Sequence, residues 1–195
     1  MNDNIYSPPA ANLDLDPAAL EALGQKKFYV VAPLKYFVLY FFTLGAYEYY
    51  WFYKNWSLFK ARTNENIWPV MRAIFPVFFA HALFERVDSY LHNEGAEYSW
   101  TPSTTATTFV ILQIAGNVLN RLSIKTDNTW IDVLSIVIIV PLVLPMYNAQ
   151  KAINAACDDP EGKSNAKLGA GNYAWMFVGV IFWVLAIAGT VIKQP

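Results

Sequence analysis

The apolar positions of the chain are grouped into five stretches separated by polar connections. They cover residues 34–53, 67–86, 106–122, 130–147 and 173–192. Each approaches the roughly 20 residues that a helix needs to cross about 30 Å of hydrocarbon. Because a helix satisfies its own backbone in lipid, the pattern predicts an all-α, polytopic helical membrane protein. About five transmembrane spans would lie in one domain, residues 28–195.

The first stretch is unusual because its helical pattern continues from Phe28 to Lys60, far beyond one crossing. Gly45 is a plausible break within it. Two alternatives stay open: one long helix that crosses and emerges into the headgroups, or a re-entrant half before Gly45 followed by a half that lies flat on the membrane. Tyr and Trp concentrate at membrane interfaces, so an interfacial role is expected for the aromatic residues and the lysine after Gly45, which are Tyr50, Trp51, Tyr53, Lys54 and Trp56.

Residues 1–27 are expected to form a soluble tail, because they are acidic and rich in proline. They lack the cationic start of a signal peptide. Asp16 and Pro17 resemble an N-cap and a first helical position, and Gly24 suits the residue after a helix end. A short helix is therefore expected from Pro17 to Leu23.

Composition supports a membrane protein: 55% of the residues are hydrophobic and 15% are charged, whereas soluble domains carry about 25% charged residues. The net charge of −1 gives no basic field for nucleic acid, so the bilayer is the expected partner. With five crossings, Lys and Arg divide nearly equally between the two sides. The orientation is therefore not set by charge.

Six polar residues are expected to lie at similar depth, judged from their distance to the connections 54–66 and 123–129. They are Glu48, Arg72, Asn117, Asn120, Arg121 and Asp132. Ionisable groups inside lipid face protein or water. Either Glu48 pairs with Arg72 while the amides join helices, or the residues form a polar vestibule for an ion or a small solute.

One helical face near residue 86 carries His81, Glu85, Asp88 and His92, at spacings of 4, 3 and 4. Histidine with carboxylates can bind zinc or iron. The spacing matches no metal signature, however, and charged residues are also normal on a solvated helix end. No nucleotide-binding, hydrolase or metalloprotease motif is present, and the single cysteine, Cys157, lies beside two aspartates. Neither an enzymatic activity nor a cofactor is expected.

Two segments resemble a family of uncharacterised small bacterial inner-membrane proteins. They are FYVVAPLKYFVLYFFTLGAYEYYWFYKNW, residues 28–56, and NENIWPVMRAIFPVFFAHALFERVD, residues 64–88. The TLGAY step at 43–47 followed by YWFYK at 50–54 is the most specific element. The resemblance implies a multi-pass protein of the bacterial inner membrane, and it transfers no binding residue. We expect a structural, accessory or partner-binding subunit that joins a protein partner or its own copies; the alternative is an oligomeric channel or small-solute carrier.

Overall fold

The computed structural model describes residues 27–96 and 98–192, with side chains as far as Gly189. Over these residues the chain forms helices and one short 3-10 turn, without any strand. The expected all-α class is confirmed. The helix expected from Pro17 to Leu23 lies outside the described residues.

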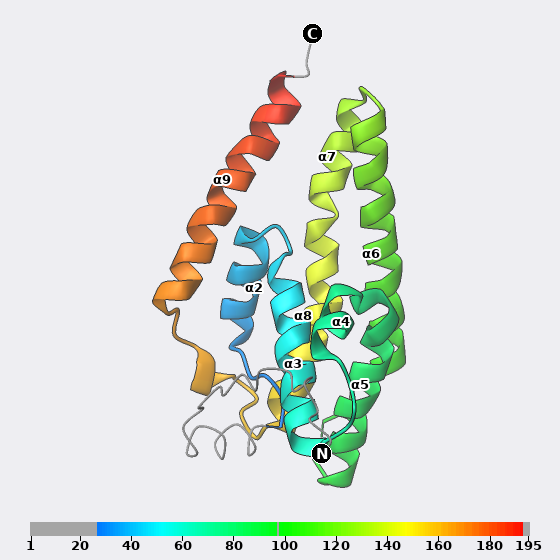
Figure 1. The fold of residues 1–195 in the computed structure, drawn as a ribbon, viewed down its shortest axis with the longest axis vertical. Coiled ribbons are helices and arrows are strands. Elements are labelled where there is room, and N and C mark those ends of the chain that lie inside the picture. The colour runs from blue at the N-terminus through cyan, green and yellow to red at the C-terminus, as the bar shows by residue number, and fades with distance from the viewer. Residues whose placement is uncertain (1–26, 97, 193–195) are drawn as a thin grey trace, which may run out of the picture.

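The helices form two groups that differ in how far they reach toward the upper end of the view (Figure 1). The first group reaches only partway toward the upper end of the view: α2 (Pro33–Phe42), α3 (Tyr47–Thr63), α4 (Pro69–Ile74) and α5 (Pro76–Asn93). The second group extends to the upper end: α6 (Pro102–Lys125), α7 (Thr129–Val137) continued downward by α8 (Ile139–Ala156), and α9 (Ala170–Ile192). The 3-10 turn η1 (Lys163–Asn165) lies between α8 and α9.

Proline sets the start of several helices. Pro33, Pro69, Pro76 and Pro102 each stand in the first turn of a helix, where the missing N–H has no intrahelical acceptor to lose. Pro76 also explains the break between α4 and α5, because the residue before a proline avoids helical dihedrals. The expected span 67–86 is therefore two helices that meet at Phe75.

The expected span 34–53 is not one helix. A turn over residues 43–46 separates α2 from α3, and Figure 1 shows the chain rising through α2 and returning through α3. Leu44 and Gly45 both have positive φ, 52° and 83°, and glycine adopts this region at no steric cost. The single long helix was therefore the wrong alternative, because α2 and α3 form a hairpin about residues 43–46.

The last three expected spans lie within long helical segments. Residues 106–122 belong to α6, 130–147 extend over α7 and α8, and 173–192 belong to α9. Pro141 cannot donate to the carbonyl one turn earlier, which accounts for the interruption at Ile138. Within the described residues, two helical segments are long and apolar enough to cross a membrane, Thr129–Ala156 and Ala170–Gly189.

The packed core lies in the lower half, where large side chains such as Trp51, Trp56 and Phe84 are fully buried between helices. An extended segment, residues 28–32, passes through this core, and amide side chains satisfy its backbone. Asn55 accepts from the Tyr29 N–H at 3.0 Å. Gln150 donates to the Tyr29 carbonyl at 3.2 Å. Buried backbone needs such partners, so these amides substitute for a neighbouring strand.

The amide clamp continues at Val31 and Val30. Asn154 donates to the Val31 carbonyl at 2.9 Å and accepts from the Val31 N–H at 3.3 Å. Asn165, in η1, donates to the Val30 carbonyl at 2.8 Å. We call Asn55, Gln150, Asn154 and Asn165 the amide clamp, because together they fix the segment that leads into α2.

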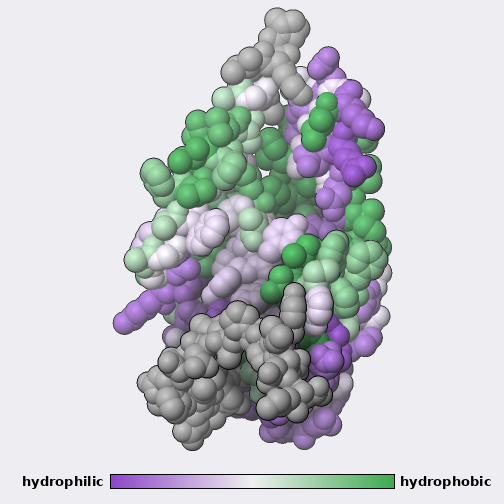
Figure 2. Space-filling model, in the orientation of Figure 1, coloured by the Kyte–Doolittle hydropathy of each residue, from purple (hydrophilic) through white to green (hydrophobic). Residues whose placement is uncertain are grey.

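The upper half exposes apolar side chains instead of burying them. Only 6% of the most apolar part of α9 is buried, against 28% for the α7–α8 segment. Figure 2 shows hydrophobic residues over α9 and hydrophilic residues toward the lower end and over the upper end of α6. A water-soluble surface rarely exposes so large a continuous apolar area.

Candidate functional site

The turn between α2 and α3 closes its own hydrogen bonds. The Thr43 hydroxyl donates to the Leu39 carbonyl at 2.7 Å and accepts from the Tyr47 N–H at 2.9 Å. The Gly45 N–H donates to the Tyr40 carbonyl at 2.8 Å. The four residues that end a helix leave carbonyls without intrahelical donors, and this turn supplies donors locally. A hairpin tip of this kind is compatible with an apolar surrounding.

Helix α9 packs closely against the end of α2. A Cβ added at Gly179 would lie 1.6 Å from the Phe42 carbonyl oxygen, so glycine is required for this approach. The Trp183 indole stacks on Phe41, with ring centroids 5.0 Å apart, and its N–H donates to the Phe41 carbonyl at 2.9 Å. These contacts hold the first half of α9 beside the hairpin and create a groove between them.

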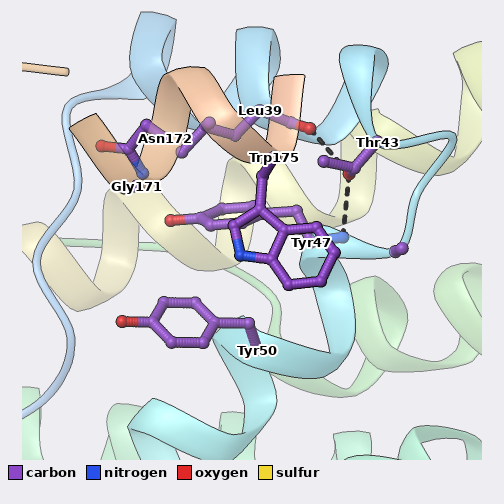
Figure 3. Close-up of a pocket in the computed structure, with 8 residues that line it drawn as sticks. Leu39, Thr43, Tyr47, Tyr50, Gly171, Asn172 and Trp175 are labelled. Carbon is purple, nitrogen blue, oxygen red and sulfur yellow. Dashed lines mark hydrogen bonds between the residues drawn. The ribbon is translucent and has the colours of Figure 1, made fainter. Parts of the chain in front are cut away.

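The aromatic groove lies between the α2–α3 turn and the start of α9 and has a volume of about 340 Å³. Figure 3 shows Trp175 entering it from α9, with Tyr47 and Tyr50 contributed by α3. The remaining lining residues are Leu39, Thr43, Ala46, Gly171 and Asn172. Ligand pockets have volumes of about 300–1,000 Å³ and are mostly apolar with a few polar groups. The groove fits that description.

A second cavity, of about 530 Å³, lies nearer the lower end and shares Tyr50 with the aromatic groove. We call it the basic pocket, because two of its lining side chains are lysines. It is lined by Lys27, Phe28, Tyr29, Val30, Tyr50, Lys54, Leu58, Cys157, Asp158, Ser164 and Asn165. Asn165 of the amide clamp is one of these lining residues, so the clamp and the pocket depend on the same local structure.

The two lysines of the basic pocket differ in their partners. Lys27 pairs with Asp158 at 2.9 Å. Tyr90 and then Asp158 raise the pKa of Lys27, so its ammonium stays charged. The Lys54 ammonium lies 5.8 Å from the centre of the Tyr50 ring, and among the described residues no carboxylate lies within ion-pair distance of it. The pocket therefore keeps one positive charge that Asp158 does not neutralise.

Glu48 and Arg72 do not form the expected ion pair within the described part of the chain. Glu48 is buried on α3 and accepts from the Gln113 amide of α6 at 2.7 Å. Arg72 instead stacks over the Trp56 indole, 4.2 Å from its centre, and over Phe79 at 5.2 Å. The ion pair was wrong because its depth estimate placed α4 in a full crossing, whereas α4 lies beside the middle of α3.

The other four polar residues lie further along α6 and at its junction with α7. Asn117 donates back to the Gln113 carbonyl at 2.9 Å, and Asn120 and Arg121 are exposed. Asp132 is buried and accepts from the Ser123 hydroxyl. Figure 1 places the α6–α7 junction at the upper end, opposite the end of α3. The six residues therefore do not form one cluster: Glu48 bonds to Gln113 of α6, Arg72 lies apart beside Trp56, and Asp132 lies at the α6–α7 junction.

The aromatic segment of α3 has two faces. Trp51 and Trp56 are fully buried, whereas Tyr50 and Tyr53 are 45% and 41% exposed. The Trp51 indole donates to Gln150 of the amide clamp. The expectation that both tryptophans face headgroups does not hold for their side chains, because the helix turns them into the core. Tyr50, Tyr53 and the half-buried Lys54 remain on the outer face.

The proposed metal face lies along α5. His81 contacts the Thr107 hydroxyl at 3.0 Å, and Glu85 is exposed. Asp88 accepts from the Trp100 indole at 2.8 Å and lies 3.5 Å from His92. Over residues 27–96 and 98–192, no group of three or more His, Cys, Asp or Glu side chains is placed to hold a metal ion.

Sequence reasoning identified Tyr50 and Lys54 of these two cavities but missed Trp175, Asn172 and Asn165. The missed residues come from α9 and η1, more than 100 positions away, so only the fold could bring them together. Comparison of the chain with protein-family models, curated proteins and solved structures finds no significant match.

Proposed function

We propose that this chain is a multi-pass protein of the bacterial inner membrane with three crossings, formed by α6, α7–α8 and α9. Helices α2–α3 and α4–α5 then enter partway from one side and return. The resemblance of residues 28–88 to bacterial inner-membrane proteins supports the location. The continuous apolar exposure of α9 and the self-contained turn at 43–46 support the arrangement, because lipid tolerates only backbone that is satisfied internally.

The distribution of basic residues supports an orientation with the lower end in the cytoplasm, where Lys and Arg are enriched. The helices and connecting segments of the lower half carry Lys27, Lys54, Lys60, Arg62, Arg86, Lys151, Lys163 and Lys167. In the described chain the end of α6 carries Arg121 and Lys125. The basic residues are concentrated on one side of the membrane only if α2–α3 and α4–α5 enter and return. Five full crossings would divide the same residues between both sides.

Cysteine labelling separates three crossings from five. In a Cys157→Ser background, single cysteines replace Lys60, Asp127 or Lys163. With three crossings, a membrane-impermeant maleimide labels the cysteine at 127 in cells with an intact inner membrane. The cysteines at 60 and 163 react only after permeabilisation. Five crossings would place 60 and 127 on the same side, and that labelling pattern would contradict the arrangement.

We propose that within the membrane the protein acts as a partner-binding subunit, and the observation that carries this role is the bare surface of α9. Phe177, Phe182 and Leu185 are 69%, 56% and 61% exposed. The helix packs on α2 near Gly179 and touches α7 only slightly. Such a helix can pack against a transmembrane helix of another subunit through close van der Waals contact.

The alternative, a channel or carrier, has less support. The polar residues that would line a path are dispersed, and neither the aromatic groove nor the basic pocket includes Glu48, Arg72 or Asn117.

Photo-crosslinking from α9 tests the role. A photoreactive amino acid replaces Phe177 or Leu185, with Met146, which is fully buried in α8, as the matched control. A discrete, stoichiometric protein adduct is expected from the α9 positions and not from position 146. An adduct of two copies shows a homo-oligomer, and an adduct with another chain shows a hetero-complex. Adducts to lipid alone would contradict the partner-binding role.

A further inference from the structure

We infer that the aromatic groove and the basic pocket together bind one anionic phospholipid, with an acyl chain in the groove and the phosphate at Lys54. This inference rests on the membrane location proposed above but not on the partner-binding role of α9. It assigns one ligand to two cavities that share a wall.

The two cavities lie next to each other at Tyr50. Tyr50 lines both, and its ring contacts Tyr47 on the groove side, with centroids 5.9 Å apart, and Tyr29 on the pocket side, at 5.8 Å. An elongated ligand that passes Tyr50 thus leaves an apolar, aromatic wall and reaches a polar one. That change of chemistry along one path matches an amphiphile.

The two cavities lie at different heights along α3. The turn at 43–46 forms the tip of the hairpin, and Lys54 lies seven residues after the start of α3. At 1.5 Å per residue, this places Lys54 about 10 Å from Tyr47 toward the lower end. The groove also contains the first turns of α9, where the apolar helix begins. The groove therefore lies at the depth of the acyl chains, and the pocket lies at the depth of the headgroups.

The charge of the basic pocket favours an anionic headgroup. The pocket contains the side-chain charges of Lys27, Lys54 and Asp158, and Asp158 is paired with Lys27 at 2.9 Å. Lys54 retains an uncompensated ammonium beside Tyr50. A phosphate is the complement of that charge. A headgroup with net negative charge is attracted more strongly to Lys54 than a zwitterionic headgroup, because Lys54 repels the cation of the zwitterion.

Native mass spectrometry of the detergent-solubilised chain tests the inference, with equimolar phosphatidylglycerol and phosphatidylcholine as probes. Wild-type protein is expected to retain phosphatidylglycerol preferentially. Lys54→Gln is expected to lower that retention about fivefold, the effect of one lysine at a membrane surface. Lys60→Gln, on the same helix but outside both cavities, is the matched control and is expected to leave retention unchanged.

Further measurements separate the contribution of the acyl chains from that of the anionic headgroup. Ala46→Phe fills the groove and is expected to lower retention of both lipids, because acyl-chain burial is common to them. Glycerol phosphate, which has the anionic group without chains, is expected not to displace the lipid at equal concentration. Lys54→Arg keeps the charge and is expected to retain the preference, which guards against a misfolded Lys54→Gln.

Equal phosphatidylglycerol retention by wild type and Lys54→Gln would overturn the inference, as would displacement by glycerol phosphate alone. Either result leaves the α9 crosslinking pattern unaffected. Failure of the proposed membrane location would instead show as protein absent from the membrane fraction and as mis-sided cysteine labelling. The two failures are therefore distinguishable.

Discussion

The indole N–H of Trp183, in the middle of α9, donates at 2.9 Å to the carbonyl oxygen of Phe41, the next-to-last residue of α2. The Leu44 N–H reaches the same oxygen at 3.1 Å. A helix that ends beside apolar side chains cannot rely on water for its last carbonyls. A side chain more than 140 positions away therefore completes the hairpin tip.

Trp183→Phe is expected to keep most of the ring stacking on Phe41 but to remove the N–H donor. Because Leu44 still donates to the same carbonyl, we expect a loss of about 1 kcal/mol in the free energy of unfolding. Trp175→Phe is the matched control, since Trp175 makes no hydrogen bond among the described residues. Thermal unfolding in mild detergent measures both. An equal loss in the two variants would show that the hydrogen bond contributes nothing.

Gly179→Ala should force α9 away from α2. The added Cβ would lie 1.6 Å from the Phe42 carbonyl oxygen and 2.6 Å from its carbon, and backbone atoms cannot yield as a flexible side chain does. Overpacking costs about 1–3 kcal/mol or more, so a clear fall in melting temperature is expected. Gly189→Ala, where no atom lies within 4 Å, should not lower stability. A tolerated Gly179→Ala would show that α9 does not pack at this register.

Glu48 and Gln113 should be energetically coupled, and Glu48 and Arg72 should not. The first pair shares a 2.7 Å hydrogen bond between the buried Glu48 carboxylate of α3 and the half-buried Gln113 amide of α6. Residues in direct contact show coupling energies of about 0.5–3 kcal/mol, whereas separated residues are additive. Two double-mutant cycles with alanine substitutions, measured by thermal unfolding, compare the pairs. Coupling in the Glu48–Arg72 cycle alone would restore the ion pair that the structure excludes.

Cys157 is expected to react slowly with maleimide at pH 7. Burial raises the pKa of its thiol to about 11, and its sulfur lies 3.8 Å from the Phe28 carbonyl oxygen. Since the thiolate is the reactive form, the alkylation rate should rise about tenfold per pH unit up to that pKa. A free cysteine peptide, which ionises near pH 8.5, is the comparison. A rate that levels off near pH 8.5 would show an exposed thiol.

Hydrophobic periodicity predicted where helices form but not how far they reach. The stretch 34–53 has enough apolar residues for a crossing, yet Leu44 and Gly45 adopt positive φ and reverse the chain. Gly45 was recognisable as a break. The direction taken afterwards depends on tertiary contacts such as that between Gly179 and Phe42, which no local pattern contains. Arg72 was misplaced because its expected depth assumed full crossings at 34–53 and 67–86, whereas the chain reverses at 43–46 and breaks at Phe75.

The cavities were less predictable than the helices because their walls come from distant segments. Tyr50 and Lys54 were identifiable from the aromatic, basic character of their own helix. Trp175 lies in the apolar stretch 173–192, whose own sequence carries no sign of a cavity. Gln150 and Asn154 follow the apolar stretch 130–147 in the sequence, yet both are fully buried. A buried amide has no local signature when its partner is the backbone of a segment more than 100 positions away.

Within the amide clamp, Asn154→Ala is expected to cause a large loss in the free energy of unfolding. The substitution leaves both the N–H and the carbonyl of Val31 buried without their partner, and it removes the acceptor of the Gln150 amide at 2.7 Å. Each unsatisfied buried group costs about 1–3 kcal/mol, so a total loss of about 3 kcal/mol is expected.

Asn148→Ala is the matched control for Asn154→Ala, because Asn148 lies on the same helix with its side chain exposed. Chemical unfolding in detergent, followed by helical circular dichroism, compares the two. Asn154→Asp gives a finer test, because its carboxylate can accept from Val31 and Gln150 but cannot donate to the Val31 carbonyl. It should be destabilised at neutral pH and partly recover as the carboxylate is protonated. Equal stability of the Asn154 and Asn148 variants would show that residues 28–32 are held by side-chain packing alone.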